Sequence, residues 1–193
     1  MRKTIAAIGT AVVMALVPSM ASAHGYTVSP KSRALWCREG EVTGCGPVQY
    51  EPQSVEGPKG FPQQGPKDGS ICSAGIDRFG QLDDPSKNWP LTEVDPGQEF
   101  EFHWRLTASH RTSSWQYFIT RDGWDSSRPL TRAMLERTPF FTEASDGQTY
   151  PPKDTYHTGR LPSGKHGRHL VLGVWTIADT PNAFYSCADI DFG

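Results

Sequence analysis

The stretch from Gln98 to Thr107, QEFEFHWRLT, alternates between apolar and polar side chains. Phe100, Phe102, Trp104 and Leu106 share one face, and Glu101, His103 and Arg105 share the other. A period of two residues is the pattern of a strand that is buried on one face only. This stretch therefore predicts a half-buried strand that contributes its aromatic face to a hydrophobic core.

Other segments of the chain also fit short strands. A short strand is expected near Gly25–Ser29, and only Leu130–Arg137 has a pattern that fits a helix. The remaining predicted strands are Trp115–Thr120, Phe140–Phe141, His169–Ile177 and Phe184–Phe192. Short strands with connections rich in Gly and Pro indicate an all-β fold, a β-sandwich.

One long segment lacks regular patterning. Gly40 to Gly69 contains seven Gly and five Pro in 30 residues, which argues against a long helix or strand there. Apolar residues such as Tyr50, Val55 and Phe61 lie within it. We therefore expect an ordered, packed loop region with short helical turns between the first two strands.

The composition excludes several classes of protein. The chain has 193 residues, a formal net charge of −2 and 11% aromatic residues. This aromatic content is too high for a disordered chain. Nucleic-acid binding is disfavoured because no basic excess exists to attract phosphates. The length fits one domain, and neither a repeat nor a second domain is visible.

The N-terminus has the layout of a secretory signal peptide. Arg2 and Lys3 precede an apolar run from Ile5 to Val17, and Ala21-Ser22-Ala23 supplies an A-x-A cleavage site. A membrane anchor is the alternative, but the run is short of the roughly 20 apolar residues that a span needs. We expect residues 1–23 to be removed, which leaves residues 24–193 as a secreted, extracellular domain that does not bind membranes.

The chain has four cysteines, Cys37, Cys45, Cys72 and Cys187. An even number in an oxidising compartment favours two disulfides. Three pairings are possible, and the sequence alone does not choose between them. A bond between the first two would close a short loop, and a bond between the last two would tie the loop region to the last strand. A zinc site is disfavoured because no C-x-x-C pair occurs.

Cleavage after Ala23 would make His24 the first residue. Its α-amine and its ring Nδ1 can then chelate one metal ion. The amine has a pKa of about 7.7–8.0, against about 10.4 for lysine, so it loses its proton readily at neutral pH. With one more imidazole, three nitrogens would form a tetragonal set that suits Cu(II). An accidental histidine at this position is the alternative.

The third nitrogen has five candidate sources: His103, His110, His157, His166 and His169. His103 lies on the polar face of a strand, which fits a solvated residue better. His166 and His169 form an H-x-x-H pair that would bind a metal only weakly. His110 lies in the loop between two strong strands, where ligands tend to be presented. It is therefore the leading candidate.

Several local strings are more specific than these patterns. They are HGYTVSPKSR, CGPVQYEPQSVEG, LTASHRTSSWQYFIT, PLTRAMLERTPF and VWTIADTPNAFYSCADID. In this order, they resemble the bacterial chitin-binding type of copper-dependent lytic polysaccharide monooxygenase, auxiliary activity family ten. The resemblance spans almost the whole chain after Ala23. It implies an immunoglobulin-like or fibronectin-III-like sandwich with a large loop region between the first two strands.

The resemblance also implies roles for individual residues. It assigns His24 and His110 to a copper-binding histidine brace. It gives the apolar residue at one axial position as Phe184 and the small residue beside the opposite face as Ala108. Glu56 resembles the carboxylate that positions an oxygen species, and Trp175 resembles a buried aromatic near the metal. Without the resemblance, Glu56 reads as a solvated charge and both aromatics read as core.

The resemblance further implies a flat surface for crystalline chitin. Tyr50 would stack on a sugar ring. Polar contacts to hydroxyl and acetamide groups would come from Glu51, Gln53, Thr107, Asp179 and Asn182. Each exposed hydrogen bond contributes only about 1 kcal/mol, so binding requires many of them together.

The expected activity is oxidative cleavage of chitin, at C1 by resemblance, giving aldonic-acid ends. It requires one copper ion, an external electron donor, and O₂ or H₂O₂ as co-substrate. We expect a monomer whose partners are a crystalline chitin surface and a reductant. A non-catalytic chitin-binding or adhesion protein is the main alternative. A secreted immunoglobulin-like interaction protein is less favoured, and hydrolysis is the least favoured because no pair of carboxylates can be identified.

Overall fold

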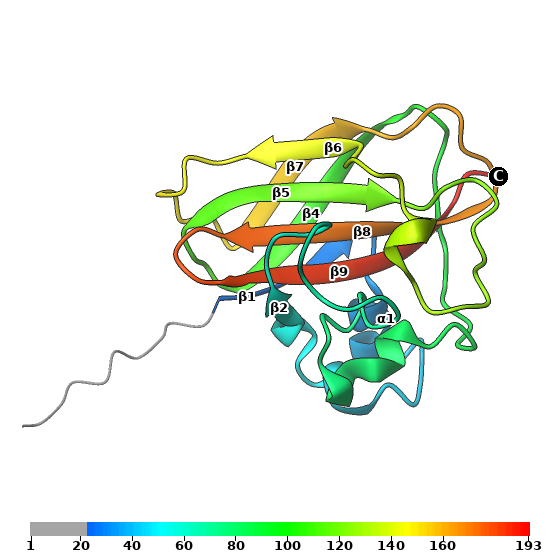
Figure 1. Ribbon diagram of the computed structural model, residues 1–193, viewed down its shortest axis with the longest axis horizontal. Helices are drawn as coiled ribbons and strands as arrows, with labels where there is room; N and C mark the ends of the chain where they lie inside the picture. Colours follow the sequence, from blue (N-terminus) through cyan, green and yellow to red (C-terminus); the bar gives the residue numbers. More distant parts are fainter. Residues whose placement is uncertain (1–22) are drawn as a thin grey trace, which may run out of the picture.

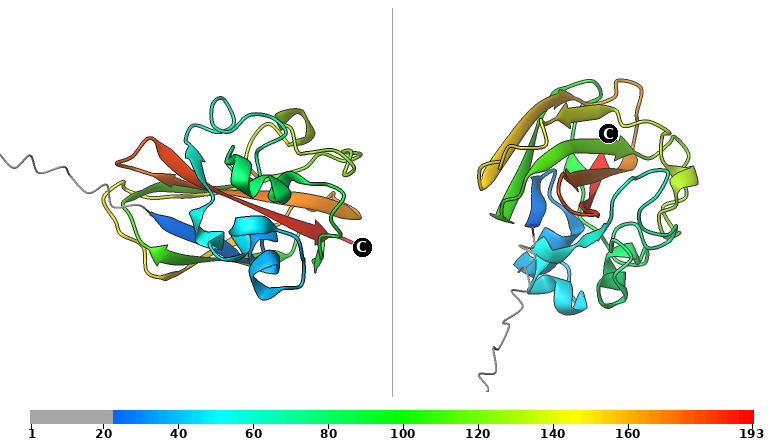
Figure 2. Two further views of the ribbon diagram at one scale, coloured as in Figure 1. Left: turned by 90° about the horizontal axis from the view of Figure 1, so that it is seen from below. Right: turned by 60° about the vertical axis from the view of Figure 1, so that its left-hand side comes forward.

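The computed structural model describes residues 23–193, so the predicted signal peptide lies outside the described residues except for Ala23. The strands form two sheets that pack face to face (Figures 1 and 2). The smaller sheet has the order β1 (His24–Ser29), β4 (Glu99–Ala108), β7 (Asp154–Arg160). The larger sheet runs β2 (Glu56–Pro58), β9 (Asn182–Asp191), β8 (Arg168–Ile177), β5 (Thr112–Ile119), β6 (Phe141–Ala144), with β3 (Thr92–Glu93) beside β9. The predicted β-sandwich is confirmed.

The core between the two sheets is built on the aromatic face of β4. Phe102, Trp104 and Leu106 are almost completely buried, whereas the intervening polar residues of the strand point away from the core. Trp104 lies against the larger sheet at Gly173 of β8, where a Cβ atom would come within 3.1 Å of the indole. A residue without a side chain is therefore needed at this position so that the sheets can approach. The alternation in β4 was correctly predicted.

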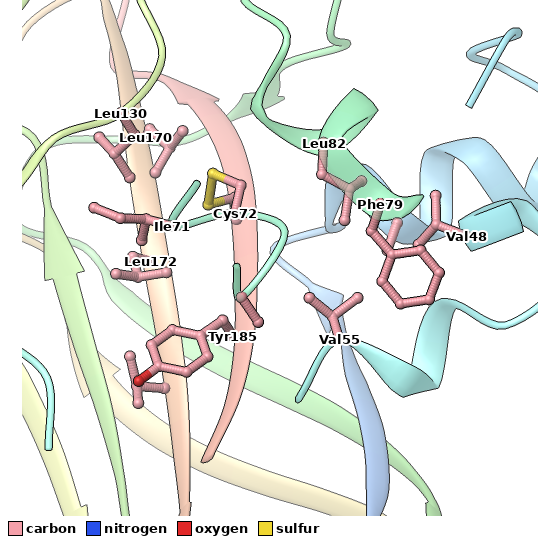
Figure 3. Packing of buried hydrophobic residues seen from close by; sticks show 14 of the residues in the cluster. Val48, Val55, Ile71, Cys72, Phe79, Leu82, Leu130, Leu170, Leu172 and Tyr185 are labelled. Atoms are coloured by element: carbon pink, nitrogen blue, oxygen red, sulfur yellow. A yellow bond between two sulfur atoms is a disulfide. The ribbon is translucent and has the colours of Figure 1, made fainter. Parts of the chain in front are cut away.

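The outer face of the larger sheet is also covered. The segment between β1 and β3 folds over β8 and β9 as one short helix and several 3₁₀ turns (Figure 1). The close-up in Figure 3 shows Ile71 and Cys72 from this segment beside Leu170 and Leu172 of β8, and Val48, Val55 and Phe79 belong to the same hydrophobic cluster. Because both of their faces are covered, β8 and β9 are buried along almost their whole length, including the polar Ser186 and Asp189 of β9.

The helices differ from the prediction. The expected helix Leu130–Arg137 is wrong, because this segment contains only a 3₁₀ turn, η4 (Arg132–Met134). Beyond this turn the backbone bonds to the end of β5: Thr120 forms a bridge with Leu135, and Glu136 N–H donates to the Ile119 carbonyl at 2.8 Å. Leu130 and Leu135 are consequently buried from an extended backbone.

The α-helix that does form was not predicted. Helix α1 (Arg33–Glu39) begins at Ser32, whose hydroxyl accepts a hydrogen bond from the Leu35 amide at 3.3 Å. It ends at Gly40, which adopts a left-handed conformation with φ of 81°. The predicted turns in the loop region are confirmed as η1 (Gly46–Gln49) and η2 (Pro52–Ser54), followed by η3 (Asp77–Asp83).

Two disulfides hold the loop region. Cys37 pairs with Cys45, and Cys72 pairs with Cys187 of β9. The second bond joins residues separated by 115 positions. It lies inside the hydrophobic cluster between the loop region and the outer face of the larger sheet (Figure 3). The expectation of two disulfides is confirmed. Of the three pairings left open by the sequence, the structure adopts the one in which the first two cysteines close a short loop and the last two close a long loop.

Candidate functional site

The predicted site residues gather at one end of the sandwich. The described chain begins there, and the β4–β5, β6–β7 and β8–β9 connections turn at the same end, on the left in Figure 1. Segments that are far apart in sequence therefore contribute to one surface. Strand β2 also reaches this end, because it pairs with the first residues of β9.

The register of β1 brings the two candidate metal ligands together. His24 pairs with Ala108, the last residue of β4, and His110 follows two residues later. The next residue, Gly25, is required here because a Cβ atom would lie 2.7 Å from a methyl group of Leu106 and 3.1 Å from Trp175. The missing side chain lets β1 lie close to the core, with half-buried His24 at the surface end of the strand.

The imidazole of His110 contacts a carboxylate through one of its two ring nitrogens. Its Nδ1 lies 2.8 Å from Oδ1 of Asp179, and Arg111 Nε donates to the other oxygen of that carboxylate at 3.0 Å. Desolvation acts to raise the pKa of Asp179, but the Arg111 hydrogen bond and the charges nearby keep that pKa below its usual range. A carboxylate on one ring nitrogen orients the other nitrogen, which is a common arrangement around metal-binding histidines.

Two buried aromatic residues lie behind the histidines. The ring of Phe184 is 6.4 Å from the ring of His24 and 5.0 Å from that of Trp175. Both aromatics are fully buried, and Trp175 Nε1 donates to the hydroxyl of Thr112 at 2.8 Å. The hydrocarbon ring of Phe184 therefore lies near His24, and this ring has no lone pair to offer a metal.

Glu56 lies on the same side as Phe184. The two residues pair across β2 and β9, and Oε1 of Glu56 accepts a hydrogen bond from Asn182 Nδ2 at 2.8 Å. The carboxylate is only partly buried. It is therefore fixed on the strand pair that carries Phe184, while part of the carboxylate remains open to solvent.

The residues predicted to bind substrate differ in how accessible they are. Tyr50 is 82% exposed, and Thr107 is also exposed. Gln53 lies in η2, which packs against β1. Glu51 is bound to Arg78 through two contacts, at 2.5 and 3.3 Å, so its carboxylate already has a partner. Sequence reasoning missed Tyr150, which is 62% exposed and lies beside His110, because exposure cannot be read from a loop sequence.

Three of the other candidate histidines have structural roles, and His166 is exposed. His103 bonds Asp154 at 2.8 Å, the buried His157 bonds the Tyr117 hydroxyl at 2.9 Å, and the buried His169 bonds Thr120 at 2.9 Å. Desolvation lowers the pKa of His157 to about 4. Within residues 23–193, no group of three or more His, Cys, Asp or Glu side chains is arranged to hold a metal ion. A metal ion bound by His24 and His110 at this end would have two imidazole ligands and would need a further donor.

Comparison with known proteins decides the family. A model described as lytic polysaccharide mono-oxygenase, cellulose-degrading, matches residues 24–190. The chain belongs to this family. Lytic polysaccharide monooxygenases of auxiliary activity family ten (AA10) are copper-dependent oxidoreductases.

Individual relatives of this lytic polysaccharide monooxygenase agree with the family model. An AA10 enzyme from Streptomyces lividans superposes with a TM-score of 0.86 at 50% identity, over 88% of this chain and 100% of that one. A lytic chitin monooxygenase from Streptomyces ambofaciens is 40% identical over 100% of this chain and 97% of its own length. A Bacillus amyloliquefaciens protein in complex with Cu(I) has a TM-score of 0.77 at 37% identity, over 87% of this chain and 99% of that one.

The first curated relatives are longer than this chain, which spans 37% of one and 55% of another. The residues present fit a copper ion. The side chains of His24 and His110 are nitrogen donors, the Asp179 contact engages one nitrogen of His110, and cleavage before His24 would add an amine. No helix among the described residues is long and apolar enough to cross a bilayer.

Proposed function

We propose that residues 1–23 are a signal peptide and that residues 24–193 are one extracellular catalytic domain. The family model begins at His24, which supports cleavage after Ala23. The first strand also begins at His24, so cleavage there leaves the sandwich intact.

The cleaved chain would hold one copper ion through the amine and ring of His24 and through Nε2 of His110. The observation that carries this proposal is the pairing of His24 with Ala108, which aligns the two histidines at one strand end. Bound copper would supply the redox chemistry that activates O₂ or H₂O₂ after reduction by an external electron donor.

The surrounding residues would control access to the metal. Phe184 would place a hydrocarbon ring near the copper without offering it a lone pair, since its ring packs 6.4 Å from that of His24. Ala108, which pairs with His24, would leave room beside the histidines because its side chain is small. Trp175 would support Phe184 from behind. Glu56 would orient the oxygen co-substrate through its exposed face, with Asn182 fixing the carboxylate.

Crystalline chitin is the proposed substrate, with hydroxylation of the C1–H bond leading to aldonic-acid ends. A relative that spans almost its entire length with this chain is named as a lytic chitin monooxygenase. Tyr50, Thr107 and Gln53 would contact the polymer, together with Asp179, Asn182 and the accessible part of Glu51. Cellulose is the second candidate, because the matching family model is described as cellulose-degrading. We expect the enzyme to act as a monomer.

The test is to incubate the copper-loaded chain beginning at His24 with β-chitin and ascorbate and to measure the masses of the soluble products. The proposal predicts aldonic-acid oligosaccharides that carry one oxygen atom more than the native oligosaccharides, together with the lactones that differ from these acids by the loss of one water. Products of native mass only, or no products, would contradict it. Chitin binding without any oxidised product, in a copper-loaded sample, would favour the alternative of a non-catalytic chitin-binding or adhesion protein.

A further inference from the structure

Tyr150 is an exposed aromatic residue next to the histidine pair. Its ring centroid is 6.2 Å from that of His110, and 62% of the residue is exposed. Only Tyr50 and Tyr156 share this exposure among the large hydrophobic residues of 23–193. Tyr150 contributes little to the core, so folding does not account for an aromatic residue at this position.

The loop that carries Tyr150 is firmly held. Asp146 accepts hydrogen bonds from the amides of Gln148 and Thr149, both at 2.8 Å. The Thr149 carbonyl accepts from the Thr112 amide at 3.2 Å, just before Tyr150. Just after it, the Pro151 carbonyl accepts from the Ser109 hydroxyl at 2.6 Å.

These bonds attach the loop to both sides of His110, because Ser109 precedes that histidine and Thr112 follows it. Arg111 adds a third connection through its 3.2 Å contact to Gln148. An aromatic side chain on a loop of fixed geometry loses little conformational entropy when it binds a ligand. The loop therefore holds Tyr150 in a position from which it can contact a ligand before the ligand binds.

The order of strands separates Tyr150 from Tyr50. The smaller sheet runs β1-β4-β7, and Tyr150 lies in the connection that leads into β7. Tyr50 lies between η1 and η2, and η2 packs against β1 at the opposite edge. His24 at the start of β1 and His110 after β4 therefore lie between the two tyrosines.

We propose that Tyr150 is a second sugar-stacking residue and that the polysaccharide contacts the protein on both sides of the histidine pair. The apolar face of a pyranose ring stacks on an aromatic side chain, and each such contact removes apolar surface from water. This inference rests on the proposed function, since it assumes that a polysaccharide binds at this end of the sandwich.

The test compares variants of the copper-loaded chain that begins at His24. Binding to β-chitin is measured by sedimentation for the wild type, Tyr150→Ala, Tyr150→Gln and Tyr150→Phe. The two variants without an aromatic ring are expected to bind about fivefold more weakly, and Tyr150→Phe is expected to bind like the wild type. Tyr156→Ala is the matched control, since Tyr156 is 53% exposed but stacks on His103 of β4.

Two further measurements distinguish the possible outcomes. Copper affinity by calorimetry and the melting temperature should be the same in all variants, so that weaker binding does not reflect a damaged site. Equal chitin binding by Tyr150→Ala and the wild type, or equal losses in Tyr150→Ala and Tyr156→Ala, would overturn the inference. If the wild type binds crystalline cellulose but not chitin, the proposed substrate fails, and the same variants test Tyr150 on cellulose. If the wild type binds neither solid, both proposals fail.

Discussion

Asn182 holds the carboxylate of Glu56 by a hydrogen bond of 2.8 Å from its amide nitrogen. The two residues come from strands separated by more than a hundred positions, and β2 and β9 pair so that Glu56 faces Phe184. The bond leaves the carboxylate partly exposed. Glu56 therefore has a fixed position, and its hydrogen bond to Asn182 engages only one of its two carboxylate oxygens.

Replacing Glu56 should slow oxidation without releasing copper. Glu56→Gln keeps the size of the side chain but removes its charge, and the production of oxidised oligosaccharides should fall about 10–100-fold. Asn182→Ala should give a smaller loss, because the carboxylate remains but is no longer oriented. Copper affinity, measured by calorimetry, should be unchanged in both variants. Full activity in Glu56→Gln would show that the carboxylate has no role.

The two disulfides should differ in how much they stabilise the fold. Cys72 and Cys187 close a loop of 115 residues, whereas Cys37 and Cys45 are separated by 8. The entropy removed from the unfolded chain grows with loop length. Replacing Cys72 and Cys187 by alanine should lower the free energy of unfolding by about 4–5 kcal/mol. Replacing Cys37 and Cys45 should lower it by about 2–3 kcal/mol. Urea unfolding measures both, and the opposite ranking would contradict this explanation.

The buried guanidinium of Arg33 should be essential for stability. Its Nε and Nη2 bind the buried carboxylate of Asp189 at 2.7 and 3.1 Å, and Nη1 donates to the Leu82 carbonyl at 2.8 Å. Arg33→Ala leaves the buried Asp189 with Arg168, at 2.8 Å, as its remaining charged partner, so the loss in urea unfolding should be about 3 kcal/mol, the lower end of the range for a broken buried pair. Lys31→Ala is the control: it removes a surface ion pair to Glu39, and the expected loss is below about 1 kcal/mol. Equal effects would refute the distinction.

Acid should destabilise the fold through His157. Burial lowers the pKa of His157 from 6.5 in the unfolded chain to about 4 in the folded one. The unfolded chain therefore binds the proton first as the pH falls, so stability is complete above pH 6.5 and declines towards pH 4. The loss should be on the order of 2–3 kcal/mol. His169, whose pKa is also lowered, mainly by desolvation, acts in the same direction.

Melting temperatures between pH 7 and pH 4 check this prediction. His157→Gln should flatten the dependence on pH, because glutamine has no proton to bind in this range and keeps a polar contact to Tyr117. His166→Gln changes an exposed histidine and should leave the dependence as it is in the wild type. An unchanged slope in His157→Gln would assign the acid sensitivity to other groups.

The sequence predicted the strands with alternating or largely apolar residues, including β4, β8 and β9, and missed β7. Strand β4 was found because its apolar and polar residues alternate. Strand β7 was missed because its buried positions are polar, Thr155 and His157. The latter is paired with the Tyr117 hydroxyl inside the core, which a pattern of hydrophobicity does not reveal. The short helix α1 was missed because seven residues give too little periodicity.

The candidate site was predicted mainly through the resemblance to a family. Reasoning from residue types alone led to His24, through its nitrogen donors, and gave His110 a modest lead. Glu56 and Phe184 had no signal of their own, because their proximity depends on the pairing of β2 with β9. The position of Tyr150 beside His110 could not be predicted either, because it depends on how a loop attaches to Ser109 and Thr112.

The most direct test of the copper site is electron paramagnetic resonance of two copper-loaded chains, one beginning at His24 and one with a single glycine before it. If the amine and ring of His24 bind together with His110, the first chain should give a near-axial Cu(II) spectrum with coupling to three nitrogens. The added glycine moves the amine away from the histidine ring, so the second spectrum should change and copper affinity should fall sharply. Identical spectra and affinities in the two chains would contradict the account.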